Sequence, residues 1–434
     1  MRFLGIGEEC DLGDMYYRLG LAGHEVRMYI ESSDAQGIYG GMVDRTPDWR
    51  AELPWIRDAG AEGVVVFESA SQGKLQDRLR SEGYQVIGGS AFGDRLESDR
   101  SFGQDQLKGH GLRTAHCTRF TDFGAAIDLV RASPARYVFK SNGADSLRTR
   151  NYIGEMHNGA DMIALLSTYQ ARWCGPGQPD FILMEHVQGI EVGVGAYFNG
   201  HRFLEPACLD WEHKRFFPGE RGELTGEMGT IVTYRGAEWL FAKTLTHMSE
   251  SLRESGYCGY INLNLMANEE GLWPIEFTSR FGYPGFAICE ALHEESWDSV
   301  FVKLLSGEDV CIDTRPGYAA GVVLTLPPFP YRYGYSELSK GLPISFHETM
   351  TEYDHRSLHL AEVALDGEQL VTSGVIGYLG VATGAGDSVE DARERAYALA
   401  GKVVVPNLRY RTDIGDRVIK HDLASLVALG YLPS

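Results

Sequence analysis

Residues 257–285 read YCGYINLNLMANEEGLWPIEFTSRFGYPG and contain the pattern on which the fold prediction depends. Two apolar runs, 259–266 and 272–277, flank a polar turn at 268–271. Short apolar runs on either side of a turn that ends in glycine are typical of a β-hairpin. The stretch therefore predicts two antiparallel strands, followed by a loop punctuated by glycine and proline.

Three polar side chains in this hairpin suggest a metal and phosphate site. Side chains two apart on a strand share a face, so Asn264 on the first strand and Glu276 on the second are expected to meet across the hairpin. Arg280 follows at once. Oxygen ligands on adjacent strands beside an arginine suit Mg²⁺ that holds a polyphosphate. The alternative is an ordinary hairpin with a solvent-facing glutamate and asparagine.

Composition narrows the class of protein. At 434 residues, with 44% hydrophobic and 23% charged residues, the chain predicts a globular protein of about three domains. A net charge of −20 argues against binding to duplex nucleic acid, although a few cations in a cleft can still attract a small anion. There is no apolar run long enough to span a membrane, and acids follow at positions 8 and 9, so no signal peptide is expected.

Cysteine usage indicates the compartment. The seven cysteines are scattered, odd in number and never spaced as CxxC, which favours buried, reduced thiols over disulfides or a zinc site. We therefore expect a cytoplasmic monomer or homodimer that acts on small molecules. Neither duplex nucleic acid nor a membrane is expected as a partner.

The first hundred residues have the order strand, helix, strand. Strands are predicted at 2–7, 25–30 and 63–67, with helices at 14–22 and 72–82, which is the beginning of a doubly wound parallel sheet. The glycines at the end of the first strand resemble half of a dinucleotide fingerprint. However, Glu8 and Glu9 lie where a phosphate would need neutral amides, so a tight turn explains these glycines better.

The middle of the chain supplies candidate nucleotide ligands. A helix is predicted at 98–109, and a strand at 137–140 ends in Lys140 before the polar loop 141–150, an arrangement that suits a phosphate ligand or, equally, a snorkelling lysine. Strands at 181–186 and 192–198, joined by a bend beside Glu185 and Glu191, would form a crevice that can bind adenine and ribose.

The remaining segments complete the predicted organisation. The cations at 213–215 precede two glycine-rich turns at 218–222 and 225–229, interpreted as a mobile lid or as a solvated loop. The other predicted elements are helices at 238–255, 287–305 and 388–399, and strands at 319–326, 369–373 and 375–381. From residue 311 onward, this pattern predicts a small α+β cap.

Taken together, these motifs resemble the ATP-grasp superfamily, and within it glycinamide ribonucleotide synthetase (phosphoribosylamine–glycine ligase). The similarity keeps its order over nearly the whole chain. The motifs that carry it lie at 99–102 (DRSF), 138–143 (VFKSNG), 184–191 (MEHVQGIE), 212–215 (EHKR), 225–229 (TGEMG), 275–285 (IEFTSRFGYPG) and 411–417 (RTDIGDR).

The resemblance implies an α/β multidomain fold with a doubly wound N-terminal domain at 1–97. It implies an ATP-grasp domain at 98–310, with lobes at 98–183 and 184–310, and a small α+β C-terminal cap at 311–434. It also implies the chemistry: the γ-phosphoryl group of ATP passes to a carboxylate, and an amine then attacks the acyl phosphate to form an amide. ATP as substrate and Mg²⁺, or Mn²⁺ in its place, are the implied cofactors.

Residue roles follow from the same resemblance and from the hairpin geometry. The expected ATP ligands are Arg100, Lys140, Glu185, Val187 and Glu191. Glu276 is the expected metal ligand, with Asn264 assisting, and Arg280 and Lys214 are the expected catalytic cations. The expected substrate ligands are Glu212, Thr225, Gly226, Glu8 and Glu68.

The chain also departs from the family pattern. Thr278 replaces the metal-site asparagine, and Tyr283 and Gly285 replace two acids. Acids also replace the glycine-rich turn that helps the family bind phosphoribosylamine, so we expect a small carboxylate, such as an amino acid, and a different, uncharged or cationic amine. Two alternatives stand beside this: a divergent but genuine phosphoribosylamine–glycine ligase, and a nucleotide-binding homologue without catalysis.

Overall fold

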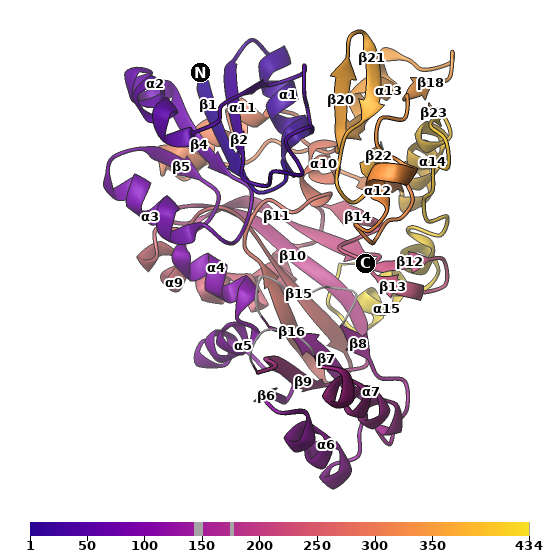
Figure 1. The fold of residues 1–434 in the computed structure, drawn as a ribbon. Helices are drawn as coiled ribbons and strands as arrows, with labels where there is room; N and C mark the ends of the chain where they lie inside the picture. Colours follow the sequence, from indigo (N-terminus) through magenta and orange to yellow (C-terminus); the bar gives the residue numbers. More distant parts are fainter. Residues whose placement is uncertain (143–150, 174–177, 434) are drawn as a thin grey trace.

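The computed structural model describes residues 1–142, 151–173 and 178–433 (Figure 1). Most of the predicted phosphate loop at 141–150 therefore lies outside the described residues. The architecture is a mixed α/β arrangement of a five-stranded parallel sheet and two antiparallel sheets of eight and four strands, so the predicted fold class is confirmed. In the described part of the chain, no helix combines the length and apolar character that a membrane crossing requires.

The N-terminal sheet is parallel and has the strand order β3-β2-β1-β4-β5. Its strands are β1 (Arg2–Gly7), β2 (Glu25–Ile30), β3 (Asp44–Arg45), β4 (Gly63–Phe67) and β5 (Gln85–Ile87). The helices of this region are α1 (Gly13–Leu21), α2 (Leu53–Asp58), α3 (Gly73–Ser81) and α4 (Ala91–Ser98). The order reverses between β1 and β4, and such a switch point opens a crevice at the carboxyl ends of the strands.

A second, antiparallel sheet has the order β6-β9-β7-β8 and lies at the opposite end of the molecule from the N-terminal sheet (Figure 1). Its strands are β6 (Cys117–Phe120), β7 (Tyr137–Ser141), β8 (Tyr152–Ile153) and β9 (Phe181–Glu185). The helices α6 (Phe123–Ala132) and α7 (Ala160–Arg172) pack against it around Phe139 and Phe181, while α5 (Arg100–Gly109) leads in from the N-terminal region.

The largest sheet has eight strands in the order β16-β15-β10-β11-β14-β17-β22-β19. Five of them precede residue 280: β10 (Ile190–Asn199), β11 (Phe203–Glu212), β14 (Gly229–Thr233), β15 (Cys258–Asn268) and β16 (Gly271–Thr278). The predicted hairpin is confirmed as β15 and β16, in whose register Asn264 pairs with Glu276 and Asn262 with Thr278.

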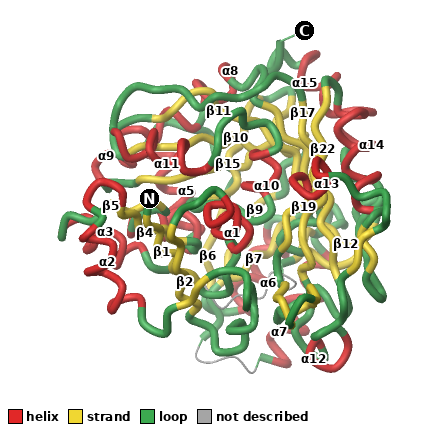
Figure 2. Tube along the Cα trace, turned by 90° about the horizontal axis from the view of Figure 1, so that it is seen from above, coloured by secondary structure: helices red, strands yellow, loops and turns green. Residues whose placement is uncertain are grey.

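Three strands from the C-terminal part of the chain extend this sheet: β17 (Tyr318–Thr325), β19 (Leu358–Leu360) and β22 (Tyr378–Gly386). Seen from above in Figure 2, α14 (Val389–Ala400) lies along the outer side of β17 and β22. The domain boundaries predicted from the sequence remain predictions. Strands from both sides of residue 310 belong to this one sheet.

Three two-stranded ribbons and several short helices complete the structure. The ribbons are β12 (Arg215–Phe217) with β13 (Arg221–Leu224), β18 (Ser345–Phe346) with β23 (Val403–Val404), and β20 (Val363–Asp366) with β21 (Gln369–Thr372). The helices are α8 (Glu238–Lys243), α9 (Ser249–Glu254), α10 (Gly285–Glu290), α11 (Trp297–Ser306), α12 (Tyr335–Leu338), α13 (Glu352–Ser357) and α15 (Leu423–Ala428).

Two predicted helices are interrupted. The helix predicted at 238–255 breaks at Thr244, whose hydroxyl donates to the carbonyl oxygen of Leu240 at 2.6 Å and so competes with the helical ladder. The helix predicted at 287–305 divides into α10 and α11, because the backbone between them pairs with another segment: the Glu294 amide donates to the Asp313 carbonyl at 2.8 Å.

One predicted strand begins later than expected. The strand predicted at 375–381 starts at Tyr378, because the amides of Ile376 and Gly377 donate to the buried Glu362 carboxyl at 3.2 and 2.7 Å instead of pairing in a sheet. At these two residues, the Glu362 carboxyl accepts the amide hydrogen bonds that a neighbouring strand would otherwise accept.

Candidate active site

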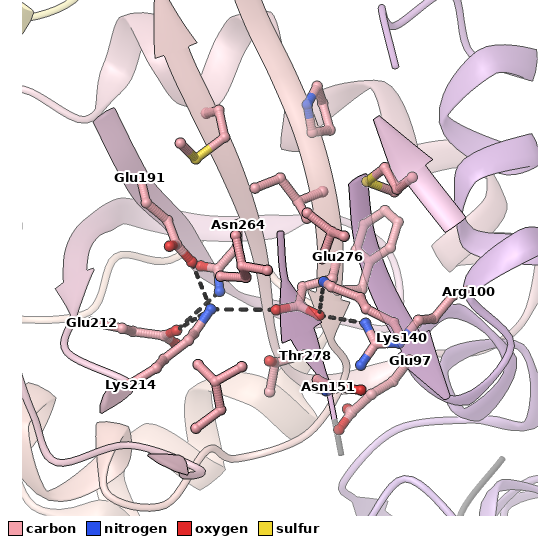
Figure 3. Close-up of a pocket in the computed structure, with 18 of the residues that line it drawn as sticks. Glu97, Arg100, Lys140, Asn151, Glu191, Glu212, Lys214, Asn264, Glu276 and Thr278 are labelled. Atoms are coloured by element: carbon pink, nitrogen blue, oxygen red, sulfur yellow. Dashed lines mark hydrogen bonds and ion pairs between the residues drawn. The ribbon is translucent and has the colours of Figure 1, made fainter. Parts of the chain in front are cut away.

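A cavity of about 270 Å³ lies between the four-stranded sheet and the edge of the eight-stranded sheet. Both sheets contribute polar side chains to it: Lys140 comes from β7, Glu191 from β10, Glu212 from β11, Asn264 from β15, and Glu276 and Thr278 from β16 (Figure 3). The sequence places these residues in five separate strands, and the fold brings them to one crevice.

Glu276 is the centre of the charge network in this cavity (Figure 3). Its Oε2 lies 2.9 Å from Lys140 Nζ and also accepts a hydrogen bond from the Arg100 guanidinium, while its Oε1 lies 3.3 Å from Lys214 Nζ. Burial alone would raise the pKa of Glu276, but Lys140, Arg100 and Lys214 together hold it well below its usual range. The carboxylate is therefore ionised and surrounded by three cations.

Lys214 is in the opposite environment to Glu276, because it is a cation surrounded by carboxylates. Its Nζ lies 2.6 Å from Glu191, 3.0 Å from Glu212 and 3.3 Å from Glu276. Burial lowers the pKa of Lys214, but these three carboxylates raise it well above its usual range. Carboxylate oxygens from β10, β11 and β16 converge at the position of its ammonium group.

The donor set at the hairpin fits a divalent cation. Asn264 Oδ1 is buried and has no hydrogen-bond partner, while Asn264 Nδ2 donates to Glu212 at 3.0 Å. An unpaired buried oxygen beside the ionised Glu276, its cross-strand neighbour, offers the oxygen ligands that Mg²⁺ or Mn²⁺ takes. The predicted convergence of Asn264 and Glu276 is confirmed in the strand register; their role as metal ligands remains a prediction.

An apolar slot occupies the side of the cavity formed by β9 and the hinge that follows it. Ala115, Val138, Met184, Val187 and Ile275 line it, and Glu185 and Glu191 also line the cavity. The amides of Glu185 and His186 already donate to the carbonyls of His116 and Arg136, at 2.9 and 3.0 Å. A flat heterocycle placed in this slot would therefore be recognised by other groups of the hinge, among them the backbone of Val187.

Arg280 also lines the cavity and is held by a residue that the sequence did not indicate. Its Nε lies 3.1 Å from Glu97 Oε1, and Glu97 Oε2 accepts the amide of Ser279 at 2.8 Å. Glu97 raises the pKa of Arg280, more than burial lowers it. Glu97 lies two positions before the start of the motif at 99–102, but nothing in its spacing pointed to Arg280.

A second lining residue, Asn151, was also missed. Its Oδ1 accepts the amide of Ser141 at 3.2 Å, which ties the end of β7 to the start of the next described segment beside the cavity (Figure 3). It follows the polar loop at 141–150, and Lys140, before this loop, was the only ligand predicted here. The spacing of Asn151 from Lys140 gave no signal of its position beside the cavity.

The segment predicted as a lid or a solvated loop contains the ribbon β12–β13. Thr225 and Gly226, at the end of this ribbon, line the cavity, and the amide and hydroxyl of Thr225 donate to the Lys214 carbonyl at 2.9 and 2.8 Å. The buried Arg411 holds the ribbon from the far side: it donates to the Arg215 carbonyl at 2.9 Å and pairs with Glu220. The C-terminal tail thus anchors this wall of the cavity.

The last two predicted substrate ligands lie outside the cavity. Glu8 is exposed in the turn after β1, whereas Glu68 is buried directly after β4. The structure therefore places twelve of the fourteen predicted site residues, all but Glu8 and Glu68, around one cavity.

Comparison with known proteins shows what this chain is similar to. The family model for the ATP-grasp (A) domain of phosphoribosylglycinamide synthetase matches residues 98–286. Phosphoribosylamine–glycine ligase of Pseudomonas aeruginosa is 28% identical to this chain over 392 residues, which cover 88% of this chain and 87% of that protein.

Solved structures show the same fold. The crystal structure of phosphoribosylamine–glycine ligase from Thermotoga maritima matches with a TM-score of 0.72 at 23% identity, covering 95% of this chain and all of that one. The biotin carboxylase domain of 2-oxoglutarate carboxylase from Hydrogenobacter thermophilus, solved with MgADP and bicarbonate, matches with a TM-score of 0.65 at 12% identity over 100% of this chain and 99% of that one.

Proposed function

From the premise that this chain is an ATP-grasp ligase resembling phosphoribosylamine–glycine ligases, as its family match and relatives show, we propose that it joins a small carboxylate to an amine through an acyl phosphate. The observation that supports this most directly is the set of cations at Glu276: Arg100, Lys140 and Lys214 come from three separate segments and contact one carboxylate.

These cations suit phosphoryl transfer, which depends on positioning and charge neutralisation more than on covalent help. Arg100 and Lys140 would release the Glu276 carboxylate and bind the phosphate oxygens of ATP instead. Glu276, freed from these contacts, would hold Mg²⁺ together with Asn264. The metal would neutralise phosphate charge and orient the triphosphate.

Arg280 and Lys214 would then serve the transferring group. The γ-phosphoryl group leaves ADP and forms a bond to a carboxylate oxygen of the substrate, and Arg280 stabilises the negative charge that builds up on it. An unprotonated amine attacks the acyl carbon, phosphate leaves with the bonding electrons, and the amine loses a proton as the amide forms. No nucleophilic side chain is required, because the two substrates are held in reacting geometry.

The amine acceptor is the second part of the proposal. The β1–α1 turn carries Glu8, Glu9 and Asp11, and Glu9 pairs with Arg332. Because this turn retains excess negative charge after that pairing, we propose an amine that is uncharged or cationic at this end. The carboxylate substrate would be small, such as an amino acid.

A second candidate is the reaction named for the relatives, in which phosphoribosylamine and glycine are the substrates. The named relatives, which align along 88% of this chain in the P. aeruginosa case, favour this candidate over the first. The acidic turn is the observation that favours the first. A direct assay of both substrate pairs decides between the two candidates.

The assay measures ADP release by the purified chain with ATP, Mg²⁺ and pairs drawn from a panel of amino acids and amines. Phosphoribosylamine with glycine is one of the pairs. Turnover with a non-phosphorylated amine and none with phosphoribosylamine would support the first candidate, and the reverse would support the second. No ADP with any pair would count against the ligase itself.

A further inference from the structure

The corner between α4 and α5, residues 97–100, contributes two charged side chains to the cavity wall (Figure 3). Glu97 lies in the last turn of α4, and Arg100 begins α5. Glu97 contacts Arg280, and Arg100 contacts Glu276. An acid and a base on this corner therefore meet a base and an acid on β16 and the loop that follows it. Charge-assisted contacts of this kind favour one alignment of the two segments.

A close helix contact brings Glu97 within reach of Arg280. Gly93 is buried one turn before Glu97 and on the same side of α4, because residues four apart on a helix are neighbours on its surface. A Cβ on Gly93 would lie 2.6 Å from the Tyr257 ring and 3.4 Å from the Ser279 Cβ, so the helix backbone rests directly on these side chains. Glu97 then accepts the Ser279 amide with Oε2 at 2.8 Å and the Arg280 Nε–H with Oε1 at 3.1 Å. Two donors on neighbouring residues share one carboxylate, which limits how that carboxylate can turn.

The contact with Glu97 decides which part of the Arg280 guanidinium remains available. Its Nε donates to Glu97, and its Nη1 makes a longer contact of 3.4 Å with the carbonyl oxygen of Phe281. Among the residues that the structure describes, Nη2 of Arg280 has no hydrogen-bond partner. Because Arg280 lines the cavity, this Nη2 is the nitrogen left to bind an anion that enters it.

Glu97 is also the main electrostatic partner of Arg280. It raises the pKa of Arg280 more than burial lowers it. The side chains of Arg280 and Glu97 are only 15% and 20% exposed, so solvent and salt screen this pair less than they screen a surface pair. In the described ranges, Glu97 is the one carboxylate that forms an ion pair with Arg280. The orientation of the guanidinium consequently depends on this single acid.

We propose that Glu97 is a positioning residue: it holds Arg280 by its Nε, so that the remaining nitrogens of the guanidinium meet the phosphoryl group in transfer. Glu97 acts through Arg280 and takes no part in the bonds that form or break. This inference rests on the proposed function for the role of Arg280. Its effect on a mimic of the transferring phosphoryl group can nevertheless be measured without turnover and without knowing either substrate.

The test measures ADP binding by calorimetry in the presence of Mg²⁺, with and without aluminium fluoride, which together with ADP mimics a phosphoryl group in transfer. The forms compared are wild type, Glu97→Gln, Arg280→Met and the double variant. Glutamine keeps the size of Glu97, but it has one oxygen for the two donors and no charge. Asp94→Asn is the matched control, because it neutralises another acid on α4 that accepts the Gly73 amide instead of contacting Arg280.

We expect aluminium fluoride to tighten ADP binding at least about tenfold in wild type and in Asp94→Asn, but at most about threefold in Glu97→Gln, whose affinity for MgADP alone stays unchanged. The double variant should bind the fluoride complex as Arg280→Met does, because Glu97 acts only through Arg280.

Three results would overturn the proposal. The first is a gain in Glu97→Gln equal to that of wild type, and the second is no gain in wild type. The third is weaker binding of the fluoride complex by the double variant than by Arg280→Met, which would indicate a general structural role for Glu97. Glu97→Asp, whose shorter side chain cannot reach both donors, replaces the glutamine variant if that variant does not fold.

The two proposals fail in different ways. A chain that releases no ADP with any substrate pair would contradict the ligase, whereas a fluoride-dependent gain that requires Glu97 would still support its positioning role. A chain that releases ADP, but whose gain is the same in Glu97→Gln as in wild type, would contradict the role of Glu97 alone. The titrations and the turnover assay therefore report on Glu97 and on the ligase separately.

Discussion

Replacing Glu276 with glutamine removes the single negative charge that three cations share, while it keeps the size of the side chain. Arg100, Lys140 and Lys214 would then lose their common acceptor in a cavity where Glu276 is 23% exposed. Removing one partner of a buried ion pair costs about 3–5 kcal/mol, and partial exposure together with the other acids near Lys214 places this case at the low end, about 3 kcal/mol.

The measurement is thermal unfolding of wild type and Glu276→Gln. A multidomain chain does not give a single free energy of unfolding, so the midpoint temperature is the readout. At about 2 °C per kcal/mol for a large chain, the midpoint should fall by about 6 °C at pH 7. Glu185→Gln, which neutralises an exposed acid at the rim of the same cavity, should leave the midpoint unchanged.

The pH dependence gives the sharper test. Because the pKa of Glu276 is lowered in the folded state, its stabilisation is present above the unfolded pKa near 4.5 and is lost as the pH falls through the folded value. The gap between wild type and Glu276→Gln should thus be full at pH 6–8 and should narrow below about pH 4.5. A gap that is absent at pH 7, or that grows on acidification, would refute the charge network as a source of stability.

The other predictions concern activity, metal and a second titrating group. Lys140→Ala should lower kcat/KM for ATP by about 100-fold or more, measured by ADP release, because a phosphate ligand worth about 3 kcal/mol is removed. Chelation of divalent cations with EDTA should abolish ADP release, and added Mg²⁺ should restore it; full activity in EDTA would show that Glu276 and Asn264 hold no essential metal. Burial raises the pKa of Glu68 to about 8 in the folded protein. Wild type should therefore lose stability as the pH rises from 4.5 through about 8. Glu68→Gln should show no such loss when thermal unfolding is followed between pH 6 and pH 9.

The sequence predicted those parts of the site whose signal is local. The two apolar runs around a polar turn predicted the β15–β16 hairpin, and the period of two along a strand predicted that Asn264 lies opposite Glu276. Lys140 was found because it ends an apolar strand. In each case, the residues that decide the geometry lie in one short stretch of the chain.

The features that the sequence did not predict are contacts between distant segments. Glu97 meets Arg280 across 183 positions, and Arg411 reaches Glu220 across 191. No periodicity links residues so far apart, and a charged side chain on a helix end is usually solvated. The addition of β17, β22 and β19 to the central sheet was missed for the same reason: a strand does not carry a local mark of the strand beside which it will lie.

Both the protein and this cavity are acidic. The charge balance of the cavity therefore predicts that a triphosphate binds there only together with a metal. The described lining contains four cations (Arg100, Lys140, Lys214 and Arg280), and acidic side chains already pair with each of them. When phosphate oxygens take Arg100 and Lys140 away from Glu276, that carboxylate would be left close to the triphosphate, and two like charges at such a distance repel strongly in a partly buried site. A divalent cation between them would remove this repulsion, and Glu276 would then act as its ligand. We therefore predict a dependence on metal, which should be steepest for the nucleotide with the most negative charge.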